Sequence, residues 1–290
     1  MSFTLAFFKQ KDAEIALDDV ITFFHNEPNF FVKHLDDDLL QFVYHNPLTN
    51  VLFSITYNER QELNVEIPED IEWEYCYTTF TLSYLRPTYY AKESLDIVVK
   101  FMKYFNLAIY NPQTEPFEVK NYTFEELVDS YIQNNSLTAR EFNKQFPVLT
   151  ISKNKVDYFY DYTIKCEMLE LPEDVALPFI SFIKDKNNIV YTVFAWPQNV
   201  KTIMPITDYV LIERTYKKAL FLKKTEVSLV PFSEIQTKFK DYLVKLDDPI
   251  PCFLFETDNE TTKQLYYELS QQDFTEYEVV ETDDFVDVEF

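Results

Sequence analysis

The chain has 290 residues, of which 47% are apolar and 18% aromatic, enough for a sizeable hydrophobic core in one large or two modest domains. Its 26 Lys and Arg residues against 49 Asp and Glu residues give a net charge of −23, which repels nucleic-acid phosphates and anionic membranes. We therefore expect a folded globular protein that binds neither nucleic acid nor membranes, and whose partner is a basic protein.

Glycine is absent from the whole chain, although it makes up about 7% of residues in average proteins. An AT-rich coding sequence lowers glycine and arginine together, but the 14 prolines show that base composition explains only part of the absence. Selection or engineering explains the remainder. The P-loop, the GxGxxG dinucleotide turn, the GxSxG nucleophile elbow and the kinase loop all need glycine, so the sequence excludes these designs.

The predicted elements of the first half begin with a strand, a helix and further strands. The alternation of apolar and polar residues predicts strands at 2–8, 30–35, 39–45, 51–59 and 71–85, and apolar residues at helical spacing predict a helix at 16–26. The turn-forming cluster NPLTN at 46–50 suits a hairpin between two of these strands.

Residues 85–113, LRPTYYAKESLDIVVKFMKYFNLAIYNPQ, predict a helix followed by a strand. The helix begins near Pro87, where the missing N–H of proline costs nothing. Asn106 is predicted to close the helix in the left-handed conformation, because asparagine tolerates that conformation best among residues other than glycine.

Two short helices are predicted within 120–146, because Thr123 with Glu126 and Thr138 with Glu141 both fit the TxxE capping box. We place them in a helical connector between two α+β halves of similar size. The predicted parts are an N-terminal half at 1–118, the connector at 119–147, and a C-terminal half with an acidic tail at 148–290.

The second half is again rich in predicted strands. These are 148–152, 156–169, 178–184, 189–196 and 252–256, with helices from Ser233 to about Lys245 and at 261–272. The DKNN turn at 185–188 joins two of the strands. Because the elements do not alternate regularly between strand and helix, we predict an α+β fold with mixed or antiparallel sheets and packed helices.

No metal, cofactor or catalytic residue is predicted. The histidines, His25, His34 and His45, match no zinc pattern, and the acidic run at 36–38 lacks the alternating ligands of an EF-hand. The three cysteines stand far apart without a CxxC pair, so we expect buried free thiols. No apolar run is long enough to span a membrane and no signal peptide is visible, so we expect a cytoplasmic protein. Because the glycine-dependent loops and the metal-ligand spacings are missing, we expect that it is not an enzyme.

Arg86 stands beside Pro87, Tyr89 and Tyr90 at the start of a predicted helix, where an anion could also use the helix dipole. The alternative is that Arg86 pairs with an acid and stacks on a tyrosine. A second basic group, Arg214 with Lys217, Lys218, Lys223 and Lys224, is either a solvated hairpin or a binding surface.

The C-terminal segment 272–290 carries eight acids and no base, interleaved with apolar residues. It is either an edge strand or hairpin with its carboxylates outward, or an acidic, aromatic face that docks a basic partner. For the second interpretation, the candidate binding residues are Glu281, Asp283 and Asp284.

The run from Leu85 to Gln113, an Arg-Pro followed by two aromatic residues, an amphipathic helix and a strand ending in NPQ, resembles uncharacterised bacterial proteins found near toxin and immunity gene clusters. Those proteins tend to have glycine near positions 91 and 134, where this chain has Ala91 and Asn134. The resemblance implies an immunity or antitoxin protein that neutralises a basic toxin. Two alternatives stay open: a glycine-free version of a globular protein of unrelated function, and an enzyme of unfamiliar design.

Overall fold

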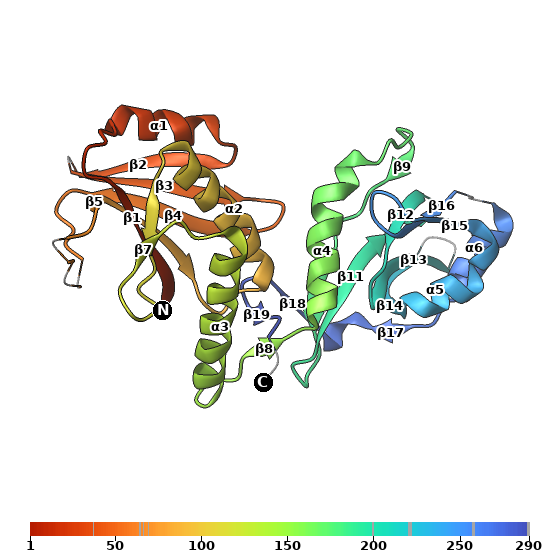
Figure 1. The fold of residues 1–290 in the computed structure, drawn as a ribbon. Helices are drawn as coiled ribbons and strands as arrows, with labels where there is room; N and C mark the ends of the chain where they lie inside the picture. The colour runs from red at the N-terminus through yellow and green to blue at the C-terminus, as the bar shows by residue number, and fades with distance from the viewer. Residues whose placement is uncertain are drawn as a thin grey trace. The chain divides into compact units, whose positions relative to one another are not determined.

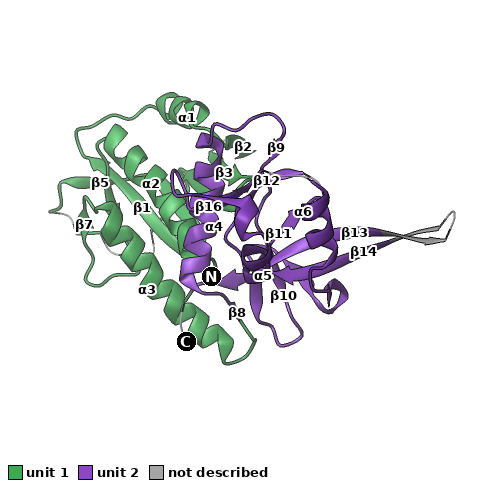
Figure 2. Ribbon diagram, turned by 90° about the vertical axis from the view of Figure 1, so that its right-hand side faces the viewer, with its two compact units in different colours: residues 1–148, 288–290 green, residues 149–287 purple. Residues whose placement is uncertain are grey.

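The computed structural model describes the chain as two compact units, coloured separately in Figure 2. Unit 1 comprises Met1–Val148 and Val288–Phe290, and unit 2 comprises Leu149–Asp287. The described residues are 1–36, 38–63, 65, 67–68, 70–198, 200–219, 222–256 and 259–288. Each unit combines sheets with packed helices, which confirms the predicted α+β fold.

Unit 1 is built on a seven-stranded sheet of order β2-β3-β4-β5-β1-β6-β7, in which every neighbouring pair is antiparallel (Figure 1). Its strands are β1 Ser2–Gln10, β2 Phe30–Asp36, β3 Leu39–Asn46, β4 Val51–Asn58, β5 Trp73–Ser83, β6 Ala108–Tyr110 and β7 Val119–Lys120. The five strands predicted before residue 86 are therefore confirmed, with ends that differ by at most two residues.

The helices of unit 1 are α1 Leu17–Asn26, α2 Thr88–Tyr104 and α3 Phe124–Asn143. The core between helices and sheet is aromatic. Phe24 of α1 stacks on Phe42 of β3 with 4.5 Å between ring centroids, and Phe101 of α2 makes an edge-to-face contact with Phe7 of β1 with 5.1 Å between centroids. All four rings are buried, so this one face of the sheet is closed by α1 and α2.

The segment 119–147, expected as a connector with two short helices, belongs to unit 1 and contains one continuous helix, α3. The predicted capping box is present: Glu126 N donates to Thr123 Oγ1 at 3.2 Å, and Thr123 N donates to Glu126 Oε2 at 2.8 Å. The second predicted helix start, at Thr138, is wrong. The buried face of α3 continues past it to Ala139, because the helix packs along its length inside unit 1.

Unit 2 differs from unit 1 in having parallel as well as antiparallel strand pairs among its described residues. Three sheets are present, of orders β17-β14-β13-β11-β10-β18, β15-β16-β12-β9 and β19-β8. The parallel pairs are β11 with β13, β9 with β12, and β8 with β19. The strands are β8 Leu149–Thr150, β9 Val175–Ala176, β10 Ser181–Lys184, β11 Val190–Trp196, β12 Lys201–Pro205, β13 Tyr209–Ala219, β14 Leu222–Pro231, β15 Leu243–Leu246, β16 Cys252–Phe255, β17 Gln272–Asp273, β18 Glu278–Val280 and β19 Phe285–Val286.

The helical elements of unit 2 are α4 Lys153–Lys165, η1 Cys166–Met168, α5 Phe232–Lys238, η2 Lys240–Tyr242, α6 Glu260–Tyr267 and η3 Phe274–Glu276. The strand predicted over 156–169 is wrong, since α4 and η1 occupy it. Val156, Phe159 and Tyr162 are buried at helical spacing, and this burial outweighs the strand preference of β-branched and aromatic residues. The helix predicted from Ser233 ends at Lys238, well before the predicted end.

Left-handed residues close several turns of this glycine-free chain. Among the described residues, four asparagines have positive φ: Asn29, Asn50, Asn106 and Asn188. The other residues with positive φ are Tyr77 (φ 56°) and Leu85 (φ 62°). Asn106 follows α2 with φ 52°, so the predicted helix closure is confirmed. Asparagine thus occupies most of the positions at which glycine would be the ordinary choice.

Candidate functional site

Tyr89 and Tyr90, two of the predicted binding residues, lie in the core of unit 1 with 0% and 2% of their surface exposed. The Tyr89 hydroxyl donates to the carbonyl of Thr49 at 2.7 Å, so the turn between β3 and β4 is tied to the start of α2. Arg86 is half-buried, and its Nη1 donates to the carbonyl of Leu85 at 3.1 Å. Of the three residues, only Arg86 therefore presents surface to a ligand.

Asn135 of α3 is a buried residue that the sequence did not single out, and it holds the backbone beside Arg86. Its Oδ1 accepts from Leu85 N at 2.7 Å, and its Nδ2 donates to the Arg86 carbonyl at 2.9 Å. The left-handed Leu85 is fixed by this pair of bonds. An asparagine in the middle of an amphipathic helix is the only sequence signal that could have pointed to it.

The turn at 281–284 presents the predicted acidic residues Glu281, Asp283 and Asp284 on the surface of unit 2, where all three are exposed. The turn is closed on itself, because Glu281 N donates to Asp284 Oδ2 at 2.9 Å and Asp284 N donates to the Glu281 carbonyl at 3.1 Å. We call these residues the acidic turn. Its backbone is a formed turn, and the three carboxylates come from within four consecutive residues.

The strands on either side anchor the acidic turn. β18 pairs with β10 at the edge of the six-stranded sheet, and β19 pairs with β8. Val280, Phe285 and Val286 are buried, with at most 6% of their surface exposed. The tail thus forms an edge strand, as one of the two interpretations predicted, and Val280, Phe285 and Val286 point inward. The predicted alternation is incomplete, because Val279 is 65% exposed and Asp287 is buried. The docking interpretation stays open.

Arg214, predicted to belong to a basic surface, is fully buried in unit 2. Its guanidinium donates to the carbonyls of Leu269 at 2.9 Å and Ser270 at 2.8 Å, just beyond α6, and to that of Tyr267, the last residue of α6, at 3.5 Å. Arg214 therefore satisfies carbonyls at the end of α6 and in the segment that leaves it, where a cation is favoured. The side chains of the other members, Lys217, Lys218, Lys223 and Lys224, lie outside the described part of the structure.

No metal site forms among the residues that the structure describes: no group of three or more His, Cys, Asp or Glu side chains could hold an ion. In the acidic run, Asp38 Oδ2 accepts from Arg60 Nε at 2.8 Å, and Asp37 lies outside the described residues. The cysteines are free. Burial raises the pKa of Cys76 and of Cys252 to about 11, so both are protonated thiols near neutral pH.

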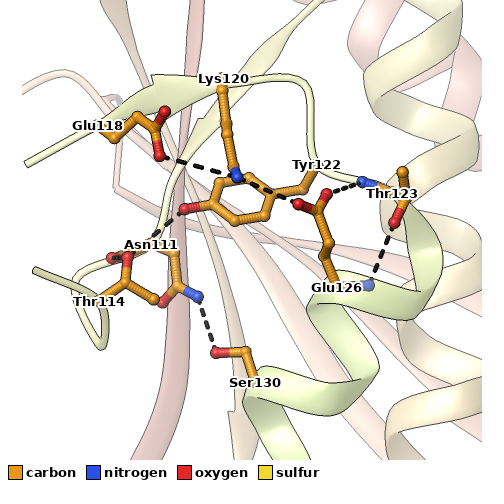
Figure 3. Close-up of polar contacts among 8 residues, drawn as sticks. All are labelled: Asn111, Thr114, Glu118, Lys120, Tyr122, Thr123, Glu126 and Ser130. Atoms are coloured by element: carbon orange, nitrogen blue, oxygen red, sulfur yellow. Dashed lines mark hydrogen bonds and ion pairs between the residues drawn. The ribbon is translucent and has the colours of Figure 1, made fainter.

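A network of polar contacts joins β7 to the start of α3 (Figure 3). The Lys120 ammonium lies 4.6 Å from the centroid of the Tyr122 ring and 3.1 Å from Glu126 Oε1. Nearby, the buried Asn111 donates through Nδ2 to Ser130 Oγ at 2.9 Å. These contacts fix the loop that enters α3, and each residue drawn makes a polar contact with another, which indicates a structural role.

A bulge interrupts the pairing of β1 with β5. Phe7 faces Thr78 and Phe8 faces Tyr75, so Cys76 and Tyr77 have no partner residue on β1. The Cys76 thiol donates instead to the Phe7 carbonyl at 3.0 Å. The bulge depends on the register between two strands that are distant in the sequence, and so no local pattern could have predicted it.

Comparisons with known proteins were made at three levels, and neither a protein-family description, nor a curated protein, nor a solved structure matches this chain. No helix in the described part of the chain is long and apolar enough to cross a membrane. The resemblance to proteins of toxin and immunity gene clusters therefore stays a prediction.

Proposed function

We propose that this protein is an acidic protein-binding module that captures a basic partner in the cytoplasm, as an immunity or antitoxin protein captures a toxin. The observation that supports the proposal is the acidic turn, which gathers Glu281, Asp283 and Asp284 on the surface of a chain with a net charge of −23. Such a field accelerates the approach of a basic protein and repels nucleic acid.

The anchoring of the turn supports the same conclusion. Because the flanking strands and the bond from Glu281 N to Asp284 Oδ2 already fix the backbone, a partner would not have to order this segment on binding. A preformed acidic surface loses less conformational entropy on association than a disordered acidic tail does.

The test measures association rates with a partner isolated on the immobilised protein, eluted with salt and purified. The variant carries Glu281→Gln, Asp283→Asn and Asp284→Asn. Its matched control carries Glu167→Gln, Glu170→Gln and Glu173→Gln, three exposed acids of unit 2 with the same total charge.

We expect the variant in the acidic turn to slow association several-fold at low salt, and the control to slow it much less. The difference should shrink as the Debye length falls to about 8 Å at physiological ionic strength. Equal rates for the two triple variants would rule out the acidic turn as the docking surface. A partner that binds at a rate independent of salt would contradict the proposal as a whole.

A further inference from the structure

A cavity of about 220 Å³ lies within unit 1, next to the bulge of β5. One wall is apolar and is formed by the loop before α1, by α1 and α2, and by the segment between α2 and β6. The apolar side chains of this wall are Ile15, Leu17, Val20, Phe101 and Leu107. The facing wall comes from the strands and carries the polar groups of Tyr57, Cys76 and Thr78. An apolar chamber with a few polar groups on one side is the usual form of a small-molecule site.

The backbone beside this cavity is strained. Tyr77 has φ 56°, a left-handed conformation that is costly for a bulky residue. The other bulky left-handed residue, Leu85, is held by Asn135 at the junction of β5, α2 and α3. The bulge that holds Tyr77 instead lines the cavity. Bulges and strained residues both concentrate at functional sites, so the two features together favour a binding role for the cavity.

The polar groups of the cavity determine what a ligand must offer. The Tyr57 hydroxyl donates to Glu59 Oε1 at 2.5 Å, the Cys76 thiol to the Phe7 carbonyl, and the Thr78 hydroxyl to the Cys76 carbonyl at 3.0 Å. Their hydrogens are therefore used, and they can offer a ligand only acceptor lone pairs. A ligand in this chamber needs a hydrogen-bond donor.

Tyr75 also lines the cavity, but its ring packs against Phe8, whose neighbour Phe7 faces α2, so the Tyr75 hydroxyl lies on the opposite face of the sheet. The ligand therefore has to supply a donor for the acceptors of Tyr57, Cys76 and Thr78. A hydroxyl is an uncharged group that supplies one.

The charges at the cavity favour an uncharged ligand. Lys9 is the cation among the lining residues, and its ammonium lies 2.6 Å from Glu74 Oε2 and 2.9 Å from the carbonyl of Ala13. The cation is thus already compensated. A charged ligand would lose its hydration on entering without gaining a free counter-charge.

Size completes the assignment. A cavity of about 150 Å³ lined by apolar side chains accepts benzene in an engineered protein, so one of about 220 Å³ has room for a single ring with a small substituent. We propose that unit 1 binds an uncharged aromatic alcohol of one ring, with the ring against the wall of Leu17 and Phe101 and the hydroxyl toward Tyr57 and Thr78.

The first test titrates the full-length protein with p-cresol, toluene and benzoate, using saturation-transfer NMR and calorimetry. We expect saturable binding of p-cresol at one site, binding of toluene about five-fold weaker because one hydrogen bond is lost, and no binding of benzoate. No saturable binding of p-cresol would overturn the proposal. Equal affinities for p-cresol and toluene would overturn the assignment of an alcohol.

The second test locates the site. Leu17→Phe fills the cavity from a partly exposed position, and Leu137→Phe, on the exposed surface of α3, is the matched control. We expect the cavity variant to weaken p-cresol binding about ten-fold or more, and the control to leave it unchanged. Thr78→Val removes an acceptor at nearly constant volume and should weaken p-cresol several-fold but not toluene. Binding unaffected by both cavity variants would refute the site. These substitutions lie in unit 1, whereas the acidic turn lies in unit 2. The outcome of the ligand titrations is therefore distinguishable from the outcome of the association-rate test of the proposed function.

Discussion

The two units satisfy the polar groups of their loops in different ways. Unit 1 uses short buried amides: Asn46, Asn111 and Asn135 each bind backbone or side chains of neighbouring loops. Unit 2 uses long side chains that reach from the core. In unit 2, Tyr158 donates to the Pro251 carbonyl at 2.7 Å, and Tyr266 donates to carbonyls of Trp196 and Glu213.

This difference follows the strand connections. Unit 1 is an antiparallel sheet whose turns are tight, and five of the six left-handed residues described in the chain lie there. A short amide reaches a tight turn without leaving space around it. Unit 2 contains parallel pairs, whose connections run farther. Without glycine, unit 1 holds its turns with asparagine amides together with tyrosines such as Tyr89, whereas the contacts described above for unit 2 come from tyrosine and arginine.

The largest expected effect comes from removing the longest of these side chains. Arg214→Met leaves the carbonyls of Leu269 and Ser270 without their donor, and we expect unit 2 to lose about 3 kcal/mol of unfolding free energy. Urea denaturation followed by tryptophan fluorescence in a Trp73→Phe background isolates unit 2, because Trp196 is then the remaining tryptophan. Lys186→Met, at an exposed position, is the control and should change stability by less than about 0.5 kcal/mol. Equal effects of the two substitutions would show that Arg214 does not hold α6.

The corresponding substitution in unit 1 is Asn135→Ala, which removes the bonds to Leu85 N and the Arg86 carbonyl. We expect a loss of about 2 kcal/mol, measured through Trp73 in a Trp196→Phe background. The neighbouring Asn134, whose Nδ2 bonds to the Ser130 carbonyl within the same helix, provides the control as Asn134→Ala. If Asn135→Ala lowered the unfolding free energy no more than Asn134→Ala does, the conclusion that buried amides stabilise the turns of unit 1 would be wrong.

A smaller effect is expected where asparagine stands in for glycine. Asn106→Ala forces alanine into the left-handed conformation after α2 and should cost about 1 kcal/mol, whereas Asn106→Gly should cost nothing. Asn188, in the turn between β10 and β11, should show the same pattern in unit 2. Thermal melts of the four variants measure this. A glycine variant less stable than its alanine counterpart would argue that the asparagine side chains have a role beyond tolerating positive φ.

The same contrast between the units explains how much the sequence revealed. Strands β2 to β5 of unit 1 pair with neighbours in the chain, and β4 alternates buried and more exposed residues, so a local pattern was sufficient to predict them. In unit 2 the segment of α4 contains three tyrosines together with Phe159, Val156 and other β-branched residues, a composition that favours a strand, and its packing makes it helical. The tight DKNN turn could be predicted, because aspartate favours turns by accepting hydrogen bonds from the backbone N–H groups that follow it. Asp185 does so from Asn187 N and Ile189 N.

The candidate sites show a similar limit. The exposure of Glu281, Asp283 and Asp284 follows from their charge and could be predicted. The burial of Tyr89 and Tyr90 could not, because it depends on the turn at Thr49 folding over the start of α2. The bulge at Tyr77 was equally hidden, since it arises from the register of β5 against β1.

The smallest effect concerns pH, and it compares one carboxylate from each unit. The backbone N–H of Thr123 lowers the pKa of Glu126 in unit 1, and the backbone N–H of Ile189 lowers the pKa of Asp185 in unit 2. A carboxyl group whose pKa is lower in the folded state stabilises the protein above its unfolded pKa of about 4, and this contribution is lost as the pH falls through the folded pKa. Glu126→Gln and Asp185→Asn should therefore lose less stability than the wild type between pH 7 and pH 2.5, each in its own unit. The change is measured from urea midpoints, read through Trp73 for Glu126→Gln and through Trp196 for Asp185→Asn. If a variant showed the same pH dependence as the wild type, the backbone N–H in that unit would not favour the ionised carboxylate.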